Sequence, residues 1–289
     1  MLFAFLLISC EQNVTIEIKT NDKRLLVDGE FTNDTIVHSI RLYSAGSFIT
    51  GKPQTIVSGA KIFVTDGIET HEYVERKDTL GLYQTVGNIG GKGGHIYTLS
   101  ITNIDIDNDG KMDSYTANNL MPVSITFDSL VSKRGLNGDG NMAVNNYAYY
   151  KLYYNGPGYV YKFALLNNNV KTPTLTDRLG LGEINSQEYT VPKVVNPGSF
   201  INYLSYLSIN STVVKGDTIS FICYNFTTEQ FEFLKEFDNN TNSKDPFIDN
   251  MYDQLKIPAN LPTNIEPADR AAGYFFVYSV SKISKVFNE

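Results

Sequence analysis

The sequence predicts a mainly β protein with one helix, and three observations lead to this prediction. Aromatic residues are abundant, with 19 Tyr and 17 Phe among 289 residues, and such residues favour strands. Short apolar or alternating runs recur along the chain with Gly or Asp between them, a pattern typical of β-sandwiches. No helical period occurs before residue 225.

The first half of the chain is expected to form an immunoglobulin-like β-sandwich over residues 24–120. The run 38–44 alternates apolar and polar residues, which is the period of a half-buried strand. The expected strands of this domain are residues 24–33, 38–44, 60–66, 81–86 and 95–102.

A second β-rich domain, sandwich or barrel-like, is expected over residues 123–289, because Met121-Pro122 interrupts the strand pattern. Residues 155–158, Asn-Gly-Pro-Gly, predict a hairpin between their flanking aromatic strands. The expected strands of this second domain are residues 124–130, 147–154, 159–166, 188–195, 212–225 and 272–280.

One helix is predicted near residues 227–238. Thr227 and Gln230 have the spacing of a capping box, in which each side chain accepts a hydrogen bond from the other residue's backbone N–H. Phe226 and Phe231 occupy the two positions of a hydrophobic staple beside it.

The first ten residues form an apolar run that ends in Cys10, and polar residues follow at once. The run is too short to span a bilayer, which takes about 20 residues. It resembles the end of a bacterial lipoprotein signal, although no Lys or Arg precedes it. The resemblance implies that residues 1–10 are a signal remnant with Cys10 as the acylated anchor, and that residues 11–23 are a tether. The alternative is a buried first strand.

The net charge argues against one class of function, and the second cysteine is expected to have a structural role. A net charge of -7 argues against nucleic acid, whose phosphates need a basic patch. Cys223 lies in an apolar run and, with Cys10 acylated, is expected to be a buried small hydrophobic residue rather than half of a disulfide.

The sharpest local motif spans residues 105–113. Four acids and a glycine occupy positions 1, 3, 5, 9 and 6 of a calcium loop of EF-hand type. Position 12 is Thr116 instead of the bidentate Glu, so the alternative is a plain acidic hairpin tip. Calcium is the one cofactor that the sequence suggests, and no cofactor is expected to be required. The candidate ligands are Asp105, Asp107, Asp109 and Asp113.

No catalytic set is evident, and the chain is expected not to be an enzyme. The glycine-rich run 90–94 lacks the spacing of a nucleotide-binding loop and is expected to be a flexible loop. The three histidines are scattered, and no nucleophile elbow occurs.

The aromatic strand 147–154 is expected to bury one face and to expose the other. An exposed tyrosine face suits contact with a peptide or a sugar, although tyrosine is also simply a good strand former. Tyr149, Lys151 and Tyr153 share one face, and Tyr150, Leu152 and Tyr154 share the other.

An ordered set of motifs resembles a family of Bacteroidota outer-membrane lipoproteins known only as a domain of unknown function. Each motif is weak alone, and their order over nearly the whole chain carries the likeness. The set comprises Cys10, residues 26–29 with Thr32 and Asn33, 58–66, 81–83, Gly94 with 97–99, 109–110 with 115–117, 264–265 and 272–275.

The resemblance implies a non-enzymatic, lipid-anchored outer-membrane protein that assists a TonB-dependent transporter in the uptake of a peptide or oligosaccharide. The alternatives are a surface adhesion or structural module, and a hydrolase whose acids converge only in three dimensions. The family offers no established chemistry, so no catalytic residue is implied.

Overall fold

The computed structural model describes residues 23–45, 55–136, 140–154, 159–168, 170–171, 199–209, 213–241 and 263–289. Strands dominate these residues, which confirms the mainly β fold, and one helix, α2, is described among them. The immunoglobulin-like assignment of the first domain stays a prediction. Residues 1–22, with the expected anchor and nearly all of the tether, lie outside the described residues, as does the expected strand at 188–195.

The strands, in chain order, are β1 (Arg24–Thr32), β2 (Ser39–Ala45), β3 (Thr55–Ile56), β4 (Lys61–Thr65), β5 (Thr70–Glu75), β6 (Leu82–Thr85), β7 (Ile96–Ile104), β8 (Asp113–Leu120), β9 (Thr126–Leu136), β10 (Met142–Tyr154), β11 (Tyr159–Asn167), β12 (Val170–Lys171), β13 (Ser199–Ile209), β14 (Thr218–Thr227) and β15 (Ala271–Val286).

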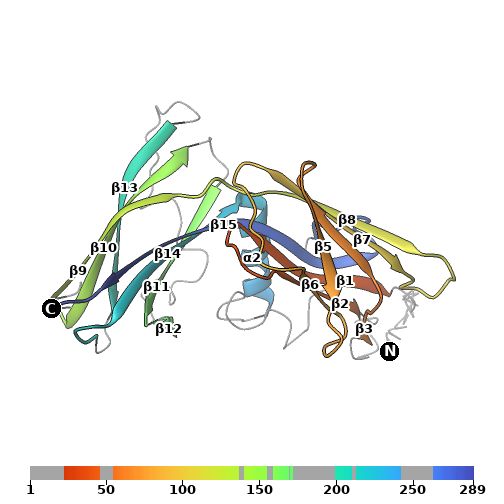
Figure 1. Ribbon diagram of the computed structural model, residues 1–289, viewed down its shortest axis with the longest axis horizontal. Helices are drawn as coiled ribbons and strands as arrows, with labels where there is room; N and C mark the ends of the chain where they lie inside the picture. Colours follow the sequence, from red (N-terminus) through yellow and green to blue (C-terminus); the bar gives the residue numbers. More distant parts are fainter. Residues whose placement is uncertain are drawn as a thin grey trace, which may run out of the picture.

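Twelve strands form one large sheet in the order β12-β11-β14-β15-β1-β2-β6-β5-β4-β7-β8, with β3 added to β2. The strand β15 joins the two parts of this sheet, because it pairs with β1 on one part and with β14 on the other (Figure 1). Its first half pairs in parallel with β1, from Leu25–Ala271 to Thr32–Tyr278, and its second half pairs antiparallel with β14. The expected domain boundary near residue 120 falls between β8 and β9. β15 pairs with β1, which precedes this boundary, and with β14, which follows it, so strands from both expected domains belong to one sheet.

A second sheet contains three strands in the order β13-β10-β9. The predicted hairpin around residues 155–158 is therefore wrong: β10 pairs with β9 and β13, whereas β11 pairs with β12 and β14 in the large sheet. Turn residues predict a change of chain direction, but they do not fix which strand becomes the hydrogen-bonding neighbour.

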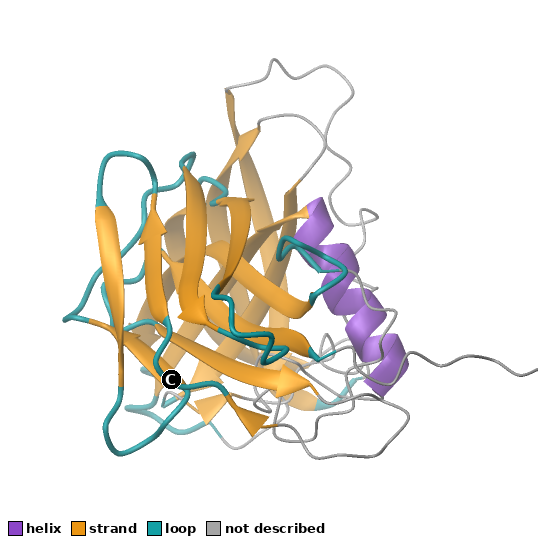
Figure 2. Ribbon diagram, turned by 90° about the vertical axis from the view of Figure 1, so that its right-hand side faces the viewer, coloured by secondary structure: helices purple, strands orange, loops and turns teal. Residues whose placement is uncertain are grey.

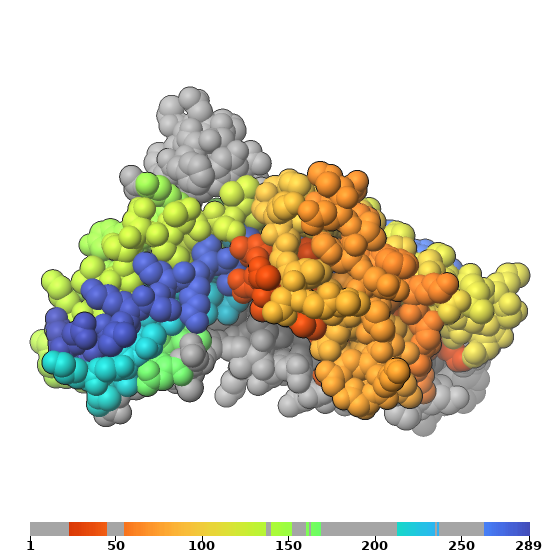
Figure 3. All heavy atoms as spheres, in the orientation of Figure 1, coloured from red at the N-terminus to blue at the C-terminus, as the bar shows by residue number. Residues whose placement is uncertain are grey.

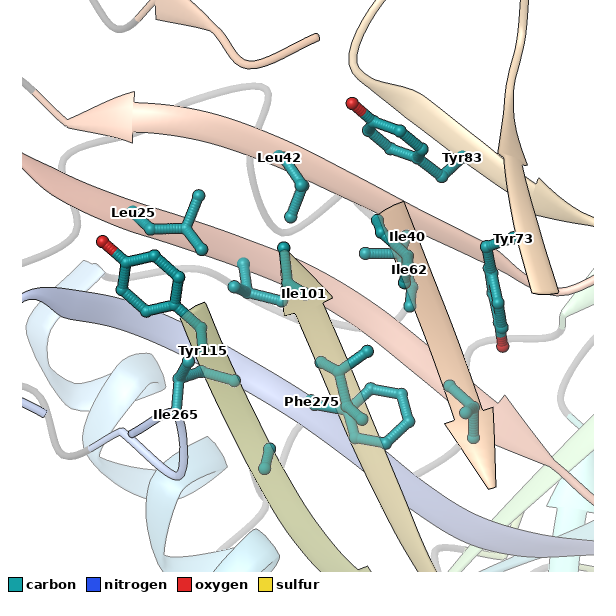
Figure 4. Close-up of a cluster of buried hydrophobic side chains, with 14 of the residues drawn as sticks. Leu25, Ile40, Leu42, Ile62, Tyr73, Tyr83, Ile101, Tyr115, Ile265 and Phe275 are labelled. Atoms are coloured by element: carbon teal, nitrogen blue, oxygen red, sulfur yellow. The ribbon is translucent and has the colours of Figure 1, made fainter. Parts of the chain in front are cut away.

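Two cores fill the space between the strands. The first lies inside the curled β1–β8 region and also takes Ile265, Phe275 and Val277 from the end of the chain (Figure 4). The second lies between the three-stranded sheet and β11, β14 and the end of β15, and it includes Tyr150, Phe163 and Phe221. Because side chains alternate along a strand, β15 faces the first core with its odd-numbered residues from Ala271 to Val277.

The even-numbered face of β15 packs against the helix α2 (Thr228–Thr241), which covers one side of the large sheet (Figure 2). The predicted capping box is confirmed. The backbone N–H of Thr227 donates to Gln230 Oε1 at 3.1 Å, and the Gln230 N–H donates to Thr227 Oγ1 at 3.4 Å. Phe233 of the helix is buried in the same cluster as Phe226 of β14 and Tyr278 of β15.

None of the described helical residues forms a span that is long and apolar enough to cross a membrane.

Candidate functional site

The aspartate-rich turn between β7 and β8 brings three of the four predicted calcium ligands together. Carboxylate oxygens of Asp105, Asp107 and Asp109 lie within 4.8 Å of one another. Gly110 has a φ of +85°, a conformation that glycine adopts without strain, so it permits the sharp turn that the sequence predicts. These three carboxylates could hold a hard cation, which takes oxygen ligands.

Backbone N–H groups already donate hydrogen bonds to some of these carboxylate oxygens. The N–H of Asp109 donates to both Asp105 Oδ1 and Asp107 Oδ1 at 3.1 Å, and the Gly110 N–H donates to Asp105 Oδ2 at 2.9 Å. Lys111 Nζ lies 3.5 Å from Asp109 Oδ2. These hydrogen bonds are those of an acidic turn, so the geometry is compatible with both interpretations and calcium stays a prediction.

The structure does not bring Asp113, the fourth predicted ligand, into this cluster. It is buried at the start of β8, where its carboxylate accepts a hydrogen bond from the Ile106 N–H at 2.9 Å. Its other oxygen lies 2.9 Å from Arg270 Nη1, just before β15. Asp113 therefore links the β7–β8 turn to the last strand of the sheet.

The glycine-rich run 90–94, which was expected to be a flexible loop, is a loop that packs closely against its neighbours. The N–H of Gly91 donates to the Thr32 carbonyl at 2.8 Å, and the N–H of Gly94 donates to the Met121 carbonyl at 2.7 Å. A Cβ on Gly93 would lie 2.9 Å from the Val123 Cα. The absence of side chains lets this run pack tightly against the segment that leads from β8 to β9.

Next to this run lies an Asp–His pair that no sequence motif indicates. His95 Nδ1 lies 2.8 Å from Asp66 Oδ2. Hydrogen bonds from the backbone N–H of Glu69, then from that of Ile68 and from His95, lower the pKa of Asp66 to about 2. The two residues are 29 positions apart in sequence, so only the pairing of β4 with β7 reveals them.

The described part of the aromatic strand β10 divides as expected between a buried and an exposed face. Tyr150 is fully buried in the second core, whereas its neighbour Tyr149 is 43% exposed and Tyr147 is half-buried. Lys151 is exposed and lies 3.7 Å from Asp128. The side chains of Leu152, Tyr153 and Tyr154 lie outside the described set. Figure 3 shows residues of β9 and β10, in yellow-green, at the molecular surface.

The structure describes only one of the two cysteines. Cys10, the predicted lipidation site, lies outside the described residues. Cys223 is 1% exposed in the second core and forms no disulfide, so its predicted burial is confirmed. Burial raises the pKa of its thiol well above the usual value.

The described residues define a class of protein built around one long curled sheet, with a second small sheet and one covering helix. The chain matches the family described as Domain of unknown function (DUF4249) over residues 11–284 and belongs to that family. No curated protein gave a match to the chain.

Proposed function

We propose that the protein is a lipid-anchored outer-membrane protein and a non-enzymatic, ligand-binding accessory of a TonB-dependent uptake system for a peptide or oligosaccharide. The family membership agrees with the domain of unknown function expected from the sequence. The proposed transporter partner rests on the resemblance of the ordered motifs to the lipoprotein family. The proposed anchor rests on the resemblance of the run before Cys10 to a lipoprotein signal.

The observation that carries the ligand-binding part is the position of Tyr149. Its side chain is 43% exposed on the strand whose next residue, Tyr150, is buried in the core. A half-exposed tyrosine on a rigid strand offers both an apolar ring and a hydroxyl to a ligand. Such residues are enriched at sites of recognition, and their support by a packed core reduces the entropy lost on binding.

Calcium would have a structural part in this proposal. A calcium ion at Asp105, Asp107 and Asp109 would offset most of the negative charge of the three clustered carboxylates and fix the turn between β7 and β8. It would supply no chemistry to a reaction.

Membrane fractionation of the native host tests the anchor. Replacing Cys10 with Ala in the chromosomal copy should move the protein from the membrane to the soluble fraction, because the acyl chains provide the attachment. A Cys223→Ala variant is the matched control and should stay in the membrane fraction. A Cys10→Ala protein that remains membrane-bound would contradict the proposed anchor.

A further inference from the structure

All three histidines of the chain lie near one end of the curled β1–β8 region, although they are scattered in the sequence. His38 and His71 both pack against the ring of Phe31, with ring centroids 4.7 and 5.8 Å from it. Tyr97 packs against the same ring at 4.8 Å, and its own ring lies 6.5 Å from that of His95. Histidine is the side chain whose charge ordinarily changes near neutral pH, so this end of the sheet concentrates groups that respond to mild acid.

His38 is the most deeply buried of the three. It is 2% exposed, whereas His71 and His95 are partly exposed. Its Nε2 lies 3.2 Å from the Asp34 carbonyl oxygen and 3.0 Å from the Ile89 carbonyl oxygen. Because carbonyl oxygens only accept, Nε2 carries the hydrogen of the neutral ring, and Nδ1 is the atom that would gain a proton.

The contact with Ile89 ties His38 to the loop of residues 86–94, in the connection between β6 and β7. A second link runs through Thr85. Its hydroxyl accepts a hydrogen bond from the His38 N–H at 3.1 Å and donates to the Gly87 carbonyl at 3.0 Å. Both the side chain and the backbone of His38 are therefore linked to this loop.

The loop itself buries little apolar surface. Five of its nine residues are glycine, Val86 is 73% exposed, and Ile89 is only partly buried. Backbone hydrogen bonds, such as the two between Ile36 and Ile89 of 3.1 and 2.9 Å, therefore supply much of its attachment. A segment of this kind opens locally at a lower free energy than the strands beside it.

Beneath the loop lies part of the first core. Gly91 fits so closely against Phe31 and Met121 that a Cβ at this position would clash with both side chains. Phe31 and Met121 are both fully buried. Movement of the loop away from them would expose this apolar part of the core to solvent.

We propose that His38 is a pH-sensitive latch, whose neutral imidazole keeps residues 86–94 closed over Phe31 and Met121 and whose protonation releases them. A second proton gives the buried imidazole a charge that its surroundings solvate poorly. Opening of the loop admits water to the ring and removes that penalty. The inference goes beyond the proposed function and does not depend on it.

Among the described residues, the titratable groups that act on His38 are Asp34, in its own segment, and His71, from β5. Burial has the largest effect and lowers the pKa of His38, the two carbonyl contacts and the charge of Asp34 raise it, and the charge of His71 lowers it. The resulting pKa lies below the ordinary value of 6.5. The closed loop is therefore fully favoured above pH 6.5 and loses stability as the pH falls from there towards the folded pKa.

Hydrogen exchange at pH 7.5 and pH 5.0, on the full chain in its non-acylated form, tests the latch. Protection factors remove the dependence of the intrinsic exchange rate on pH. The amides of Ile89, Gly91 and Gly94, which donate hydrogen bonds, should be protected at least tenfold less at pH 5.0. The amides of β7 (Ile96–Ile104) should keep their protection. Unchanged protection in the loop, or an equal loss in β7, would overturn the proposal.

Two glutamine variants identify the histidine that is responsible. In His38→Gln the new side chain can still donate to a carbonyl but does not titrate, so the loop should be equally protected at both pH values. His71→Gln is the matched control and should keep the tenfold loss, because His38 still titrates. A loss that persists in His38→Gln, or one that disappears in His71→Gln alone, would contradict the latch.

An NMR titration of the unsubstituted protein gives the answer should His38→Gln leave the loop open at both pH values. The ring signals of His38 should titrate with a midpoint below 6.5, and the protection of the loop should fall with the same midpoint. Loss of protection that follows the titration of His71 or His95 instead, or that occurs while His38 stays neutral, would overturn the proposal.

Discussion

Gly273 of β15 lies so close to the carbonyl oxygen of Val27 on β1 that a Cβ could not fit between them. Its φ is +83°, in the left-handed region that favours glycine. This contact lies within the parallel pairing of the first and last strands, where Val27 and Gly273 are register partners. The close approach of these two strands therefore depends on a residue without a side chain.

Replacement of Gly273 by Ala should lower the free energy of unfolding by about 2–4 kcal/mol, because it adds a steric clash to the backbone strain. Chemical denaturation measures the change. Gly216→Ala is the matched control: its φ is +100° and nothing lies within 4 Å of the added Cβ, so it should cost only about 1 kcal/mol. Equal losses in the two variants would refute the proposed close contact.

Stability should fall with acid partly through Asp66. Its pKa is lowered to about 2 in the folded protein, from an ordinary value of 3.8. A lowered folded pKa stabilises the protein above the unfolded value, and this contribution is lost as the pH falls from about 4 towards 2. Solvent screens this pair, because the His95 side chain is partly exposed, so Asp66→Asn should cost about 1 kcal/mol at pH 6 and progressively less below pH 4. A pH-independent difference between the two proteins would be inconsistent with this account.

Calorimetric titration with calcium separates the cation site from the plain acidic turn. If Asp105, Asp107 and Asp109 bind calcium, the heat of binding should disappear in the double variant Asp107→Ala plus Asp109→Ala. Asp113→Asn should retain the heat, because Asp113 faces Arg270 instead of the cluster. The absence of any heat at millimolar calcium, or equal heat in the double variant, would leave only the acidic turn.

Cys223 should be inert towards thiol reagents in the folded protein. Burial disfavours the thiolate, which is the reactive form, and the side chain is 1% exposed. In a Cys10→Ser chain, labelling by iodoacetamide at pH 8 should be at least a hundredfold slower under native conditions than in denaturant. Comparable rates would show that the second core is open to solvent.

Local features were predictable from the sequence because their signals lie within a few neighbouring residues. The cap formed by Thr227 and Gln230 involves residues three apart, and it forms as predicted. The burial of Tyr150 beside the exposed Tyr149 follows from the two-residue period of a strand. The close grouping of Asp105, Asp107 and Asp109 likewise follows from their spacing around one turn.

Long-range relationships were not predictable, because one sequence does not show which strands pair. The parallel pairing of β1 with β15 joins residues more than 240 positions apart, as the hydrogen bond from the Leu25 N–H to the Arg270 carbonyl illustrates. Asp113 lies outside its expected cluster for the same reason, since Arg270 is distant in sequence.

Co-purification from native membranes tests the central claim most directly. The acylated protein, tagged at its C-terminus and extracted in mild detergent, should recover a TonB-dependent transporter in near-stoichiometric amount by quantitative mass spectrometry. An unrelated tagged outer-membrane lipoprotein, prepared in the same way, should not. Recovery of the protein alone, or equal recovery of the transporter with the unrelated lipoprotein, would contradict its assignment as a transporter accessory.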